Sequence, residues 1–326
     1  MSYKTTDGLM RHLRENGISI NGSKQKRQLI NSGYFHGYKG YRFFKNPNNR
    51  IPFVSFEEIY STIQYDNQLK ALLYPKMMFI ETAIKNISIE CILNIVKSEN
   101  IQKFYNSAVE SYKTAPTNLS TDTKKKIQQK KLNLQNKIQF YLSKAYEDDN
   151  SKISHFYNNM SYNGVPLWAL FEIMTLGDIG YLLSCLNSNV RESISKKIGL
   201  NLSADTNRTL VFKYVYLLKD LRNAIAHNSV VFDTRFNKMD LTRPMKRCLE
   251  NELHLPYVNF KTIGDYIFLI CYYLKILRVT RTEIKTFIRD FEKITEDFIN
   301  KVSQKVSSMV IHPDYPSRMQ IIKNYI

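Results

Sequence analysis

Arg222 and His227 are the residues of this sequence whose types and spacing are best suited to chemistry. They lie in the segment LRNAIAH, which runs from Leu221 to His227 and has Asn223 directly after the Arg. Cleavage of RNA without a metal requires a base for the 2′-hydroxyl proton, an acid for the leaving 5′-oxygen and positive charge beside the phosphorane. One His and one Arg supply these elements, so we predict that Arg222 and His227 are catalytic.

A long amphipathic helix is expected to position this pair. It is predicted to begin after Ser203 or Asp205, either of which can cap it, and to end near His227. The apolar stripe consists of Val211, Tyr214, Val215, Leu218, Leu221 and Ile225, and a polar stripe lies opposite it. Positions five apart on an ideal helix are displaced by about 140°, whereas Asn223 and His227 share a face. Arg222 must therefore reach round the helix, or the helix must distort.

Two other interpretations of Arg–His pairs stay open at this point. Arg222 could bridge to an acid such as Asp220 while His227 caps helix carbonyls, which would make the pair structural. Arg247 and His254 form a second pair, but they lie in a predicted loop between Pro244 and Pro256 and lack the adjacent Asn. We expect the first pair, in its helical context, to be the functional one.

Charge and composition indicate the class of partner. The 326 residues contain 47 Lys and Arg against 29 Asp and Glu, a formal net charge of +18. Such a surplus attracts polyanions, and nucleic acid is the expected one. No apolar run approaches the roughly 20 residues that a membrane span needs, and no signal peptide is recognisable, so a cytoplasmic protein is expected. Cys and His show no metal-like spacing and no nucleotide motif is present, so we expect neither a metal nor a cofactor.

Residues 1–50 contain ten basic and two acidic side chains, and aromatic residues are interleaved with them. Aromatic rings can stack on bases while nearby cations hold phosphates. The predicted RNA-binding residues of this segment are Tyr34, Tyr38, Lys39, Tyr41 and Arg42. A packed Tyr-rich turn with solvated cations is an equally good interpretation.

The apolar periodicity predicts an all-α fold without a βαβ pattern or a repeat. Expected are short helices at 7–15 and 23–32, one bent or two long helices over 55–97, three short ones over 166–199 and two more at about 260–277 and 280–306. Residues 99–160 are interpreted as an insertion with one exposed basic helix, whose Lys124, Lys125 and Lys126 are further candidates for RNA binding. A merely solvated helix is at least as good an interpretation. The predicted domains are a basic aromatic N-terminal lobe, 1–54, and a helical domain, 55–326.

Several ordered blocks resemble the Abi-like abortive-infection family (AbiD/AbiF-like), and RNAIAH resembles the RNxxxH form of the HEPN ribonuclease motif. The blocks lie between about residues 8 and 235 and read LRENGI, GYFHGYKGY, FEEIY, YDNQL, FIE, WALFEIMTLG and LRNAIAHN. The Lys-rich insertion and the C-terminal helices lie outside the resemblance. Ser229 stands two residues after the His, where some HEPN toxins have a Tyr that a partner enzyme modifies, which puts such control in doubt.

The resemblance implies a HEPN-type helical bundle and a bacterial anti-phage or toxin-like ribonuclease. It implies a homodimer whose two Arg–His pairs meet, an Asn223 that orients or contacts the scissile phosphate and, in some members, regulation by a structured non-coding RNA. Our first hypothesis is an endoribonuclease that leaves 2′,3′-cyclic phosphate and 5′-hydroxyl ends. The competing hypothesis is a non-catalytic protein that grips a structured RNA. A third, a scaffold that senses phage protein through the insertion, is based on family analogy alone.

Overall fold

The computed structural model describes residues 4–239 and 241–326, and within these ranges the chain is helical and has no β-strand, only isolated β-bridges. The all-α prediction is therefore confirmed. Contacts divide the chain into two compact units. Unit 1 comprises residues 1–78, 220–241 and 249–326, and unit 2 comprises residues 79–219 and 242–248. The predicted division into 1–54 and 55–326 stays a prediction.

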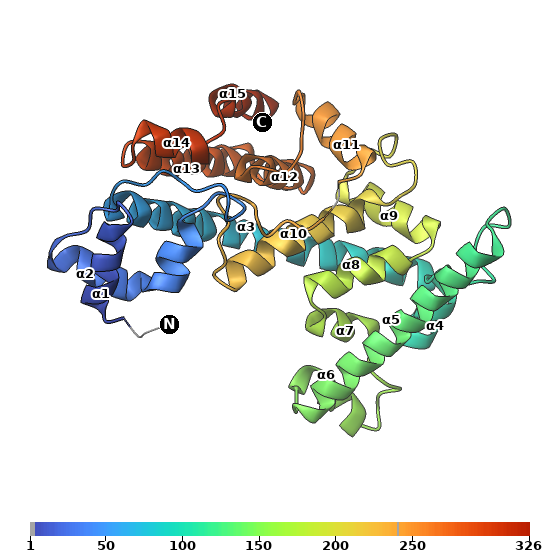
Figure 1. Cartoon of the computed structure of the whole chain (residues 1–326). Coiled ribbons are helices and arrows are strands. Elements are labelled where there is room, and N and C mark those ends of the chain that lie inside the picture. Colours follow the sequence, from blue (N-terminus) through green and yellow to red (C-terminus); the bar gives the residue numbers. More distant parts are fainter. Residues whose placement is uncertain (1–3, 240) are drawn as a thin grey trace. The chain divides into compact units, whose positions relative to one another are not determined.

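Unit 1 contains the helices at both ends of the chain. They are α1 (Thr6–Glu15), α2 (Gly22–Ser32), the π-helix η1 (Gly33–Lys39), α12 (Ile263–Ile276), α13 (Arg281–Ile299), α14 (Gln304–Val310) and α15 (Tyr315–Tyr325). The core is built around α12, whose side chains from Tyr266 to Leu274 are all buried. This helix packs on α13 and α15 (Figure 1), which agrees with the rule that a helix apolar on every side is buried.

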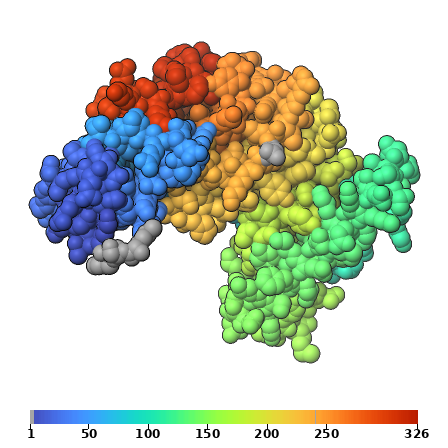
Figure 2. Space-filling view, in the orientation of Figure 1, coloured from blue at the N-terminus to red at the C-terminus, as the bar shows by residue number. Residues whose placement is uncertain are grey.

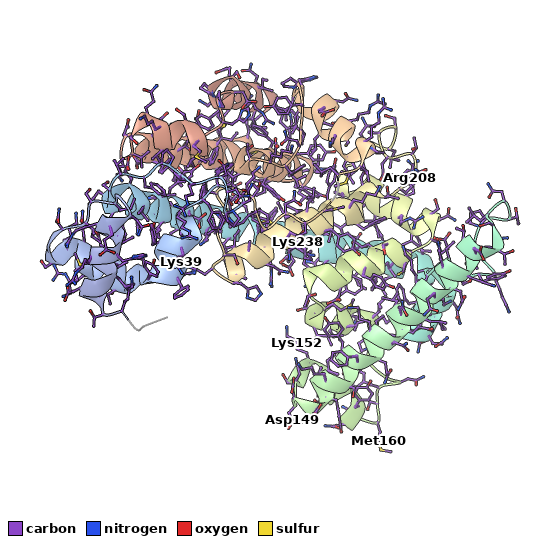
Figure 3. The ribbon with its side chains drawn as sticks, viewed as in Figure 1. Lys39, Asp149, Lys152, Met160, Arg208 and Lys238 are labelled. Atoms are coloured by element: carbon purple, nitrogen blue, oxygen red, sulfur yellow. The ribbon has the colours of Figure 1, made fainter. Side chains whose placement is uncertain are left out.

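Unit 2 contains α4 (Ile101–Ser107), α5 (Thr121–Glu147), α6 (Ser151–Asn158), α7 (Leu167–Ile173), α8 (Leu176–Cys185) and α9 (Ser188–Ile198). The helix α5 packs on α6, α7 and α8. It buries only a narrow stripe, Leu134, Ile138, Leu142 and Ala145, and leaves much of its length exposed (green in Figure 2). The loop after α6 exposes Met160 completely (Figure 3). The predicted exposed basic helix is thus present.

Three helices contribute residues to both units: α3 (Phe56–Val96), α10 (Leu210–Ala226) and α11 (Arg243–Leu253). The first is one continuous helix that contains Pro75, so the single-helix alternative is the correct one. The second begins at Leu210, later than expected, although Asp205 does accept hydrogen bonds from the backbone N–H groups of Thr209 and Leu210 at its start.

The prediction of a loop between Pro244 and Pro256 was wrong, because α11 occupies most of it. Pro244 is the second residue of this helix, where its missing N–H has no helical acceptor to lose and its fixed φ suits the first turn. The Pro that suggested a loop therefore starts a helix. Arg247 lies on α11 and His254 directly follows it.

The C-terminal region contains more helices than the sequence predicts. The two predicted helices correspond to α12 and α13, and the structure adds α14 and α15 beyond them. Within the described residues, no helix combines the length and the hydropathy that crossing a membrane would require.

Candidate active site

The helix α10 ends at Ala226, and a Schellman motif fixes the chain directly after it. The N–H of Ser229 donates to the carbonyl of Ala224 at 2.8 Å, and the N–H of Asn228 donates to that of Ile225 at 3.1 Å. Asn228 adopts a left-handed backbone with φ 52°, a conformation that Asn tolerates better than most residues. His227 is therefore the C-cap residue, and its backbone direction is set by bonds on both sides of it.

The last turn of α10 separates an apolar from a polar face as the sequence predicts. Leu221, Ala224 and Ile225 are buried, whereas Arg222 and Asn223 are half-buried and His227 is exposed. The His227 ring forms no hydrogen bond or ion pair with any described residue, since its only bond runs from its backbone N–H to the carbonyl of Asn223 at 2.9 Å. The imidazole is thus open to solvent and to a substrate.

The Arg222 side chain bonds to its neighbour on the helix. Its Nη1 donates to Oδ1 of Asn223 at 3.4 Å, and Asn223 lies on the same face as His227. The helix is regular here, because the N–H of His227 still bonds four residues back. The three predicted catalytic residues therefore all lie at the C-terminal end of α10, where the Asn223 amide links to the Arg222 guanidinium.

Asn228 anchors this turn to two other parts of unit 1. Its Oδ1 accepts a hydrogen bond from Nζ of Lys70 at 2.8 Å, and its Nδ2 donates to Nε2 of His36 at 3.1 Å. Lys70 lies on α3 and His36 on η1. The residue next to the candidate acid–base group is thus held by side chains 158 and 192 positions away in sequence.

Asp66 organises the buried side of the same network. Its carboxylate pairs with Nζ of Lys70 at 2.8 Å and accepts a hydrogen bond from the Tyr41 hydroxyl at 2.7 Å. Its other oxygen accepts the backbone N–H groups of Val231 and Phe232 at 2.8 and 2.7 Å. The side chain has no exposed surface, and four donors satisfy it, as a buried carboxylate requires.

Sequence reasoning missed His36, Asp66, Lys70 and Asn228 as supports of the site. A signal existed, because Asp66 and Lys70 form an acid–base pair four residues apart within a helix that is otherwise rich in apolar residues. A buried acid–base pair needs further hydrogen-bond partners, so burial of this pair would have indicated a contact with another segment of the chain.

The structure places two of the predicted RNA-binding rings inside the protein. Tyr41 has no exposed surface and Tyr38 is 9% exposed. Tyr41 stacks on Phe232 with ring centroids 6.0 Å apart, and its hydroxyl is engaged by Asp66. Burial beside that carboxylate raises the pKa of Tyr41. Neither ring has a face open for base stacking. For these two residues the alternative interpretation, a packed Tyr-rich turn, is the one observed.

The exposed aromatic ring of η1 is Phe35, which was not among the predicted RNA-binding residues. Phe35 is 74% exposed, and Nζ of Lys39 lies 4.4 Å from its ring centroid. The same Nζ is 5.4 Å from the half-buried ring of Tyr34, whose pKa is raised by burial and by the neighbouring Tyr38. Arg42 is half-buried. Lys39, at the end of η1, is labelled in Figure 3.

The lysines of α5 divide into two kinds. Lys125 and Lys126 are exposed. Lys124 is half-buried and donates to the carbonyl of Thr117 at 3.2 Å. The structure therefore leaves two of these three cations open to a polyanion.

Among the described residues, no group of three or more His, Cys, Asp or Glu is arranged to hold a metal ion. The four cysteines, Cys91, Cys185, Cys248 and Cys271, are buried and unpaired by disulfides. Burial raises the pKa of the Cys271 thiol, and this favours the unreactive protonated form.

Comparison with known proteins identifies the family of the chain. No curated protein and no solved structure matches it. A family model described as Abi-like protein matches residues 27–233. The matched range includes η1, Asp66, Lys70 and the whole of α10 with its Arg222–His227 turn. This range is more than half of the sequence, and the chain therefore belongs to the Abi-like protein family.

Proposed function

We propose that this Abi-like protein is a metal-independent endoribonuclease of an abortive-infection system, acting in the cytoplasm as a toxin-like antiviral enzyme. RNA would be cut to 2′,3′-cyclic phosphate and 5′-hydroxyl ends. The observation that supports this most directly is the exposed, uncommitted imidazole of His227 at the C-terminal end of the helix that contains Arg222 and Asn223. Family membership supports the abortive-infection role.

Each residue has a role that its environment suits. His227 transfers protons, because its ring is open to the substrate and its backbone is fixed by the Schellman motif. The guanidinium of Arg222 stabilises the charge that develops on the phosphorane. Asn223 orients the Arg222 side chain through its Oδ1 and can donate its amide N–H groups to the phosphate.

A second copy of the chain would complete the site. The reaction needs one group that accepts a proton and another that donates one, and a single turn supplies one imidazole. Two exposed His227 turns meeting across a twofold axis would supply both groups. The proposed enzyme is therefore a homodimer, and a strictly monomeric, active protein would contradict the mechanism.

The test compares wild-type protein with His227→Ala and with His254→Ala. Both histidines are exposed and both directly follow a helix, so the second variant is a matched control. Purified proteins are incubated with total bacterial RNA in EDTA, and the fragment ends are analysed. Wild type and His254→Ala should cut RNA to cyclic-phosphate ends, while His227→Ala should leave it intact. Equal cleavage by all three would exclude His227 as the catalytic residue.

A second candidate function is non-catalytic binding of a structured non-coding RNA. The exposed Phe35 ring with the Lys39 ammonium beside it favours this alternative, since rings stack on bases and cations contact phosphates. In that case RNA stays intact with every variant, RNA co-purifies with the protein and Phe35→Ala weakens its binding. A bound RNA could also inhibit the enzyme, so nuclease assays should use protein freed of RNA in high salt.

A further inference from the structure

We propose that a second site in unit 1, separate from the Arg222–His227 turn, binds a small phosphorylated ligand of the nucleoside monophosphate class. The site is a cavity of about 240 Å³. Its chemistry comes from two lysines, Lys45 and Lys261, from His312, and from the aromatic rings of Phe44 and Tyr257. Among the residues that line it there is no Asp or Glu.

The two lysines place like charges at one cavity. Nζ of Lys45 donates to the backbone carbonyl of Lys261 at 2.5 Å and lies 5.4 Å from the ring centroid of Phe44. Burial lowers the pKa of Lys45; the carboxylates of Asp233 and Asp265 partly oppose this, and the positive charge of Lys261 lowers the pKa further. An anion between the two ammonium groups would relieve their repulsion.

The carboxylate that raises the pKa of Lys45 most, Asp233, already has a cationic partner. Asp233 accepts the backbone N–H of Lys45 at 2.6 Å and is held by the guanidinium of Arg235, with Nε 2.9 Å from each carboxylate oxygen. The side chain of Asp233 has no exposed surface. The protein therefore neutralises Asp233 with Arg235, whereas the hydrogen bond of the Lys45 ammonium goes to the uncharged carbonyl of Lys261.

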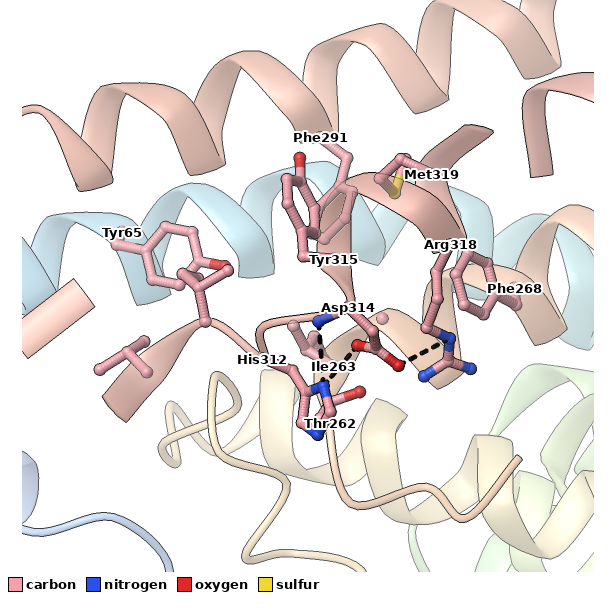
Figure 4. Close-up of a pocket in the computed structure, with 13 residues that line it drawn as sticks. Tyr65, Thr262, Ile263, Phe268, Phe291, His312, Asp314, Tyr315, Arg318 and Met319 are labelled. Carbon is pink, nitrogen blue, oxygen red and sulfur yellow. Dashed lines mark hydrogen bonds and ion pairs between the residues drawn. The ribbon is translucent and has the colours of Figure 1, made fainter. Parts of the chain in front are cut away.

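His312 is the third cationic or hydrogen-bonding group, and its ring is oriented by a carboxylate. Its Nδ1 faces Oδ1 of Asp314, and the other carboxylate oxygen, Oδ2, accepts the hydroxyl of Tyr257. Nε of the buried Arg318 lies 3.8 Å from Asp314. Figure 4 shows His312, Asp314 and Arg318 joined in this order. With Nδ1 turned to the carboxylate, Nε2 is left to contact a ligand.

The side chains that line the site favour a mononucleotide over a bare anion. The rings of Phe44 and Tyr257 offer apolar walls for a base, and Asn259 and Ser308 offer polar groups for its edges or for a ribose. A narrower recess of about 40 Å³ adjoins the cavity and shares Thr262, Val310 and His312 with it (Figure 4). The recess is too small for a base, so the ligand is assigned to the larger cavity.

Calorimetric titration of the RNA-free full-length protein tests the assignment. The ligands are AMP, GMP, CMP and UMP, with adenosine and inorganic phosphate as partial ligands. At least one monophosphate should bind saturably and more tightly than either partial ligand. Lys261→Gln removes one ammonium and keeps the backbone carbonyl that Lys45 uses, and it should weaken binding roughly tenfold or more. Lys293→Gln, an exposed charge change on α13 outside this cavity, should have no effect.

Several outcomes would overturn the proposal. These are absence of saturable binding by every monophosphate, equal weakening by Lys261→Gln and Lys293→Gln, or phosphate binding as tightly as the nucleotides. A single-stranded oligoribonucleotide is titrated in parallel. If Lys261→Gln weakens its binding as much as that of the monophosphate, the cavity belongs to an RNA path. The thermal unfolding of both variants should match wild type, because neither lysine side chain is buried.

Discussion

The two units each contain a carboxylate that accepts hydrogen bonds from a Lys and a Tyr, yet the two arrangements do different things. In unit 1, Asp66 joins α3 to the segment that follows the candidate catalytic turn. In unit 2, Asp178 on α8 accepts Nζ of Lys137 at 2.7 Å and the hydroxyl of Tyr141, both from α5. The first holds the candidate active site, and the second holds the Lys-rich helix.

Burial separates the two arrangements energetically. The side chains of Lys70 and Asp66 are 9% and 0% exposed, whereas those of Lys137 and Asp178 are 41% and 12% exposed. A buried pair is strongly destabilising to break, because the remaining charge is left without a partner, while an exposed partner is resolvated. We therefore expect the Asp66–Lys70 pair to contribute much more to the free energy of unfolding than the Asp178–Lys137 pair does.

The largest effect is expected from Asp66→Asn. This variant leaves Lys70 as a buried charge without its carboxylate and weakens the acceptor for Val231 and Phe232. The free energy of unfolding should fall by about 3–5 kcal/mol. Urea denaturation measures this, and a loss below about 1 kcal/mol would show that the network is not essential.

Asn228→Ala should have the next largest effect. It removes the bridge between Lys70 and His36 and puts Ala at φ 52°, together costing roughly 2 kcal/mol. Asn228→Gly keeps the turn and loses only the bridge. If the bridge positions His227, the glycine variant should lower the kcat of RNA cleavage while its KM and its stability change little. Unchanged kcat would leave Asn228 a purely structural residue.

Asp178→Asn should destabilise unit 2 by only about 1 kcal/mol, since Lys137 is resolvated when its partner changes. Unfolding followed through Trp168 fluorescence reports on this unit, because Trp168 is the only Trp of the sequence and lies on α7. If Asp178→Asn lowered the free energy of unfolding as much as Asp66→Asn does, the proposed difference in stabilisation between the two carboxylates would be wrong.

The pH dependence of the same variant sharpens the comparison. Burial alone would raise the pKa of Asp178, but hydrogen bonds from Lys137, Thr175 and Tyr141 outweigh it and lower the pKa below the ordinary 3.8. A lowered pKa gives stability that is present above pH 3.8 and is lost as the pH falls through the lowered value. The difference in unfolding free energy between wild type and Asp178→Asn should therefore be constant from pH 7 to about 5 and shrink below about 4. A difference that grows on acidification would contradict this assignment.

The smallest effect on stability is expected from the double variant Lys125→Gln, Lys126→Gln. Both side chains are exposed, so the unfolding free energy should change by less than about 0.5 kcal/mol. If these lysines contact RNA, filter binding should show weaker affinity and a shallower dependence on salt. Unchanged salt dependence would make α5 a solvated surface.

The sequence predicts the helices well where apolar residues recur along one face. The stripe of α10 and the position of His227 at its end follow from spacing alone. The missed helix α11 shows where this kind of prediction fails. A Pro in the interior of a helix interrupts it, whereas a Pro in the first turn, such as Pro244, favours it. Only the structure distinguishes these positions.

The support of the candidate site could not be predicted, because it depends on contacts between distant segments. His36 and Asn228 are 192 positions apart, and nothing in the local pattern of either indicates the other. The same holds for Tyr41, whose surroundings of Lys39 and Arg42 indicate an exposed platform although Asp66 and Phe232 bury it. The local sequence shows how many charged residues lie near Tyr41. It does not show which distant residues bury the ring.

The separation of Asp66 from Val231 has a consequence for the time at which the molecule matures. These partners are 165 residues apart, and ribosomes add roughly 5–20 residues per second. Asp66 therefore waits roughly 8 to 33 seconds after its own synthesis before its backbone partners exist. During that interval η1 and the first half of α3 are present without the turn that they later hold. The candidate nuclease centre is assembled late in translation, and a nascent chain interrupted before residue 227 lacks the candidate catalytic histidine.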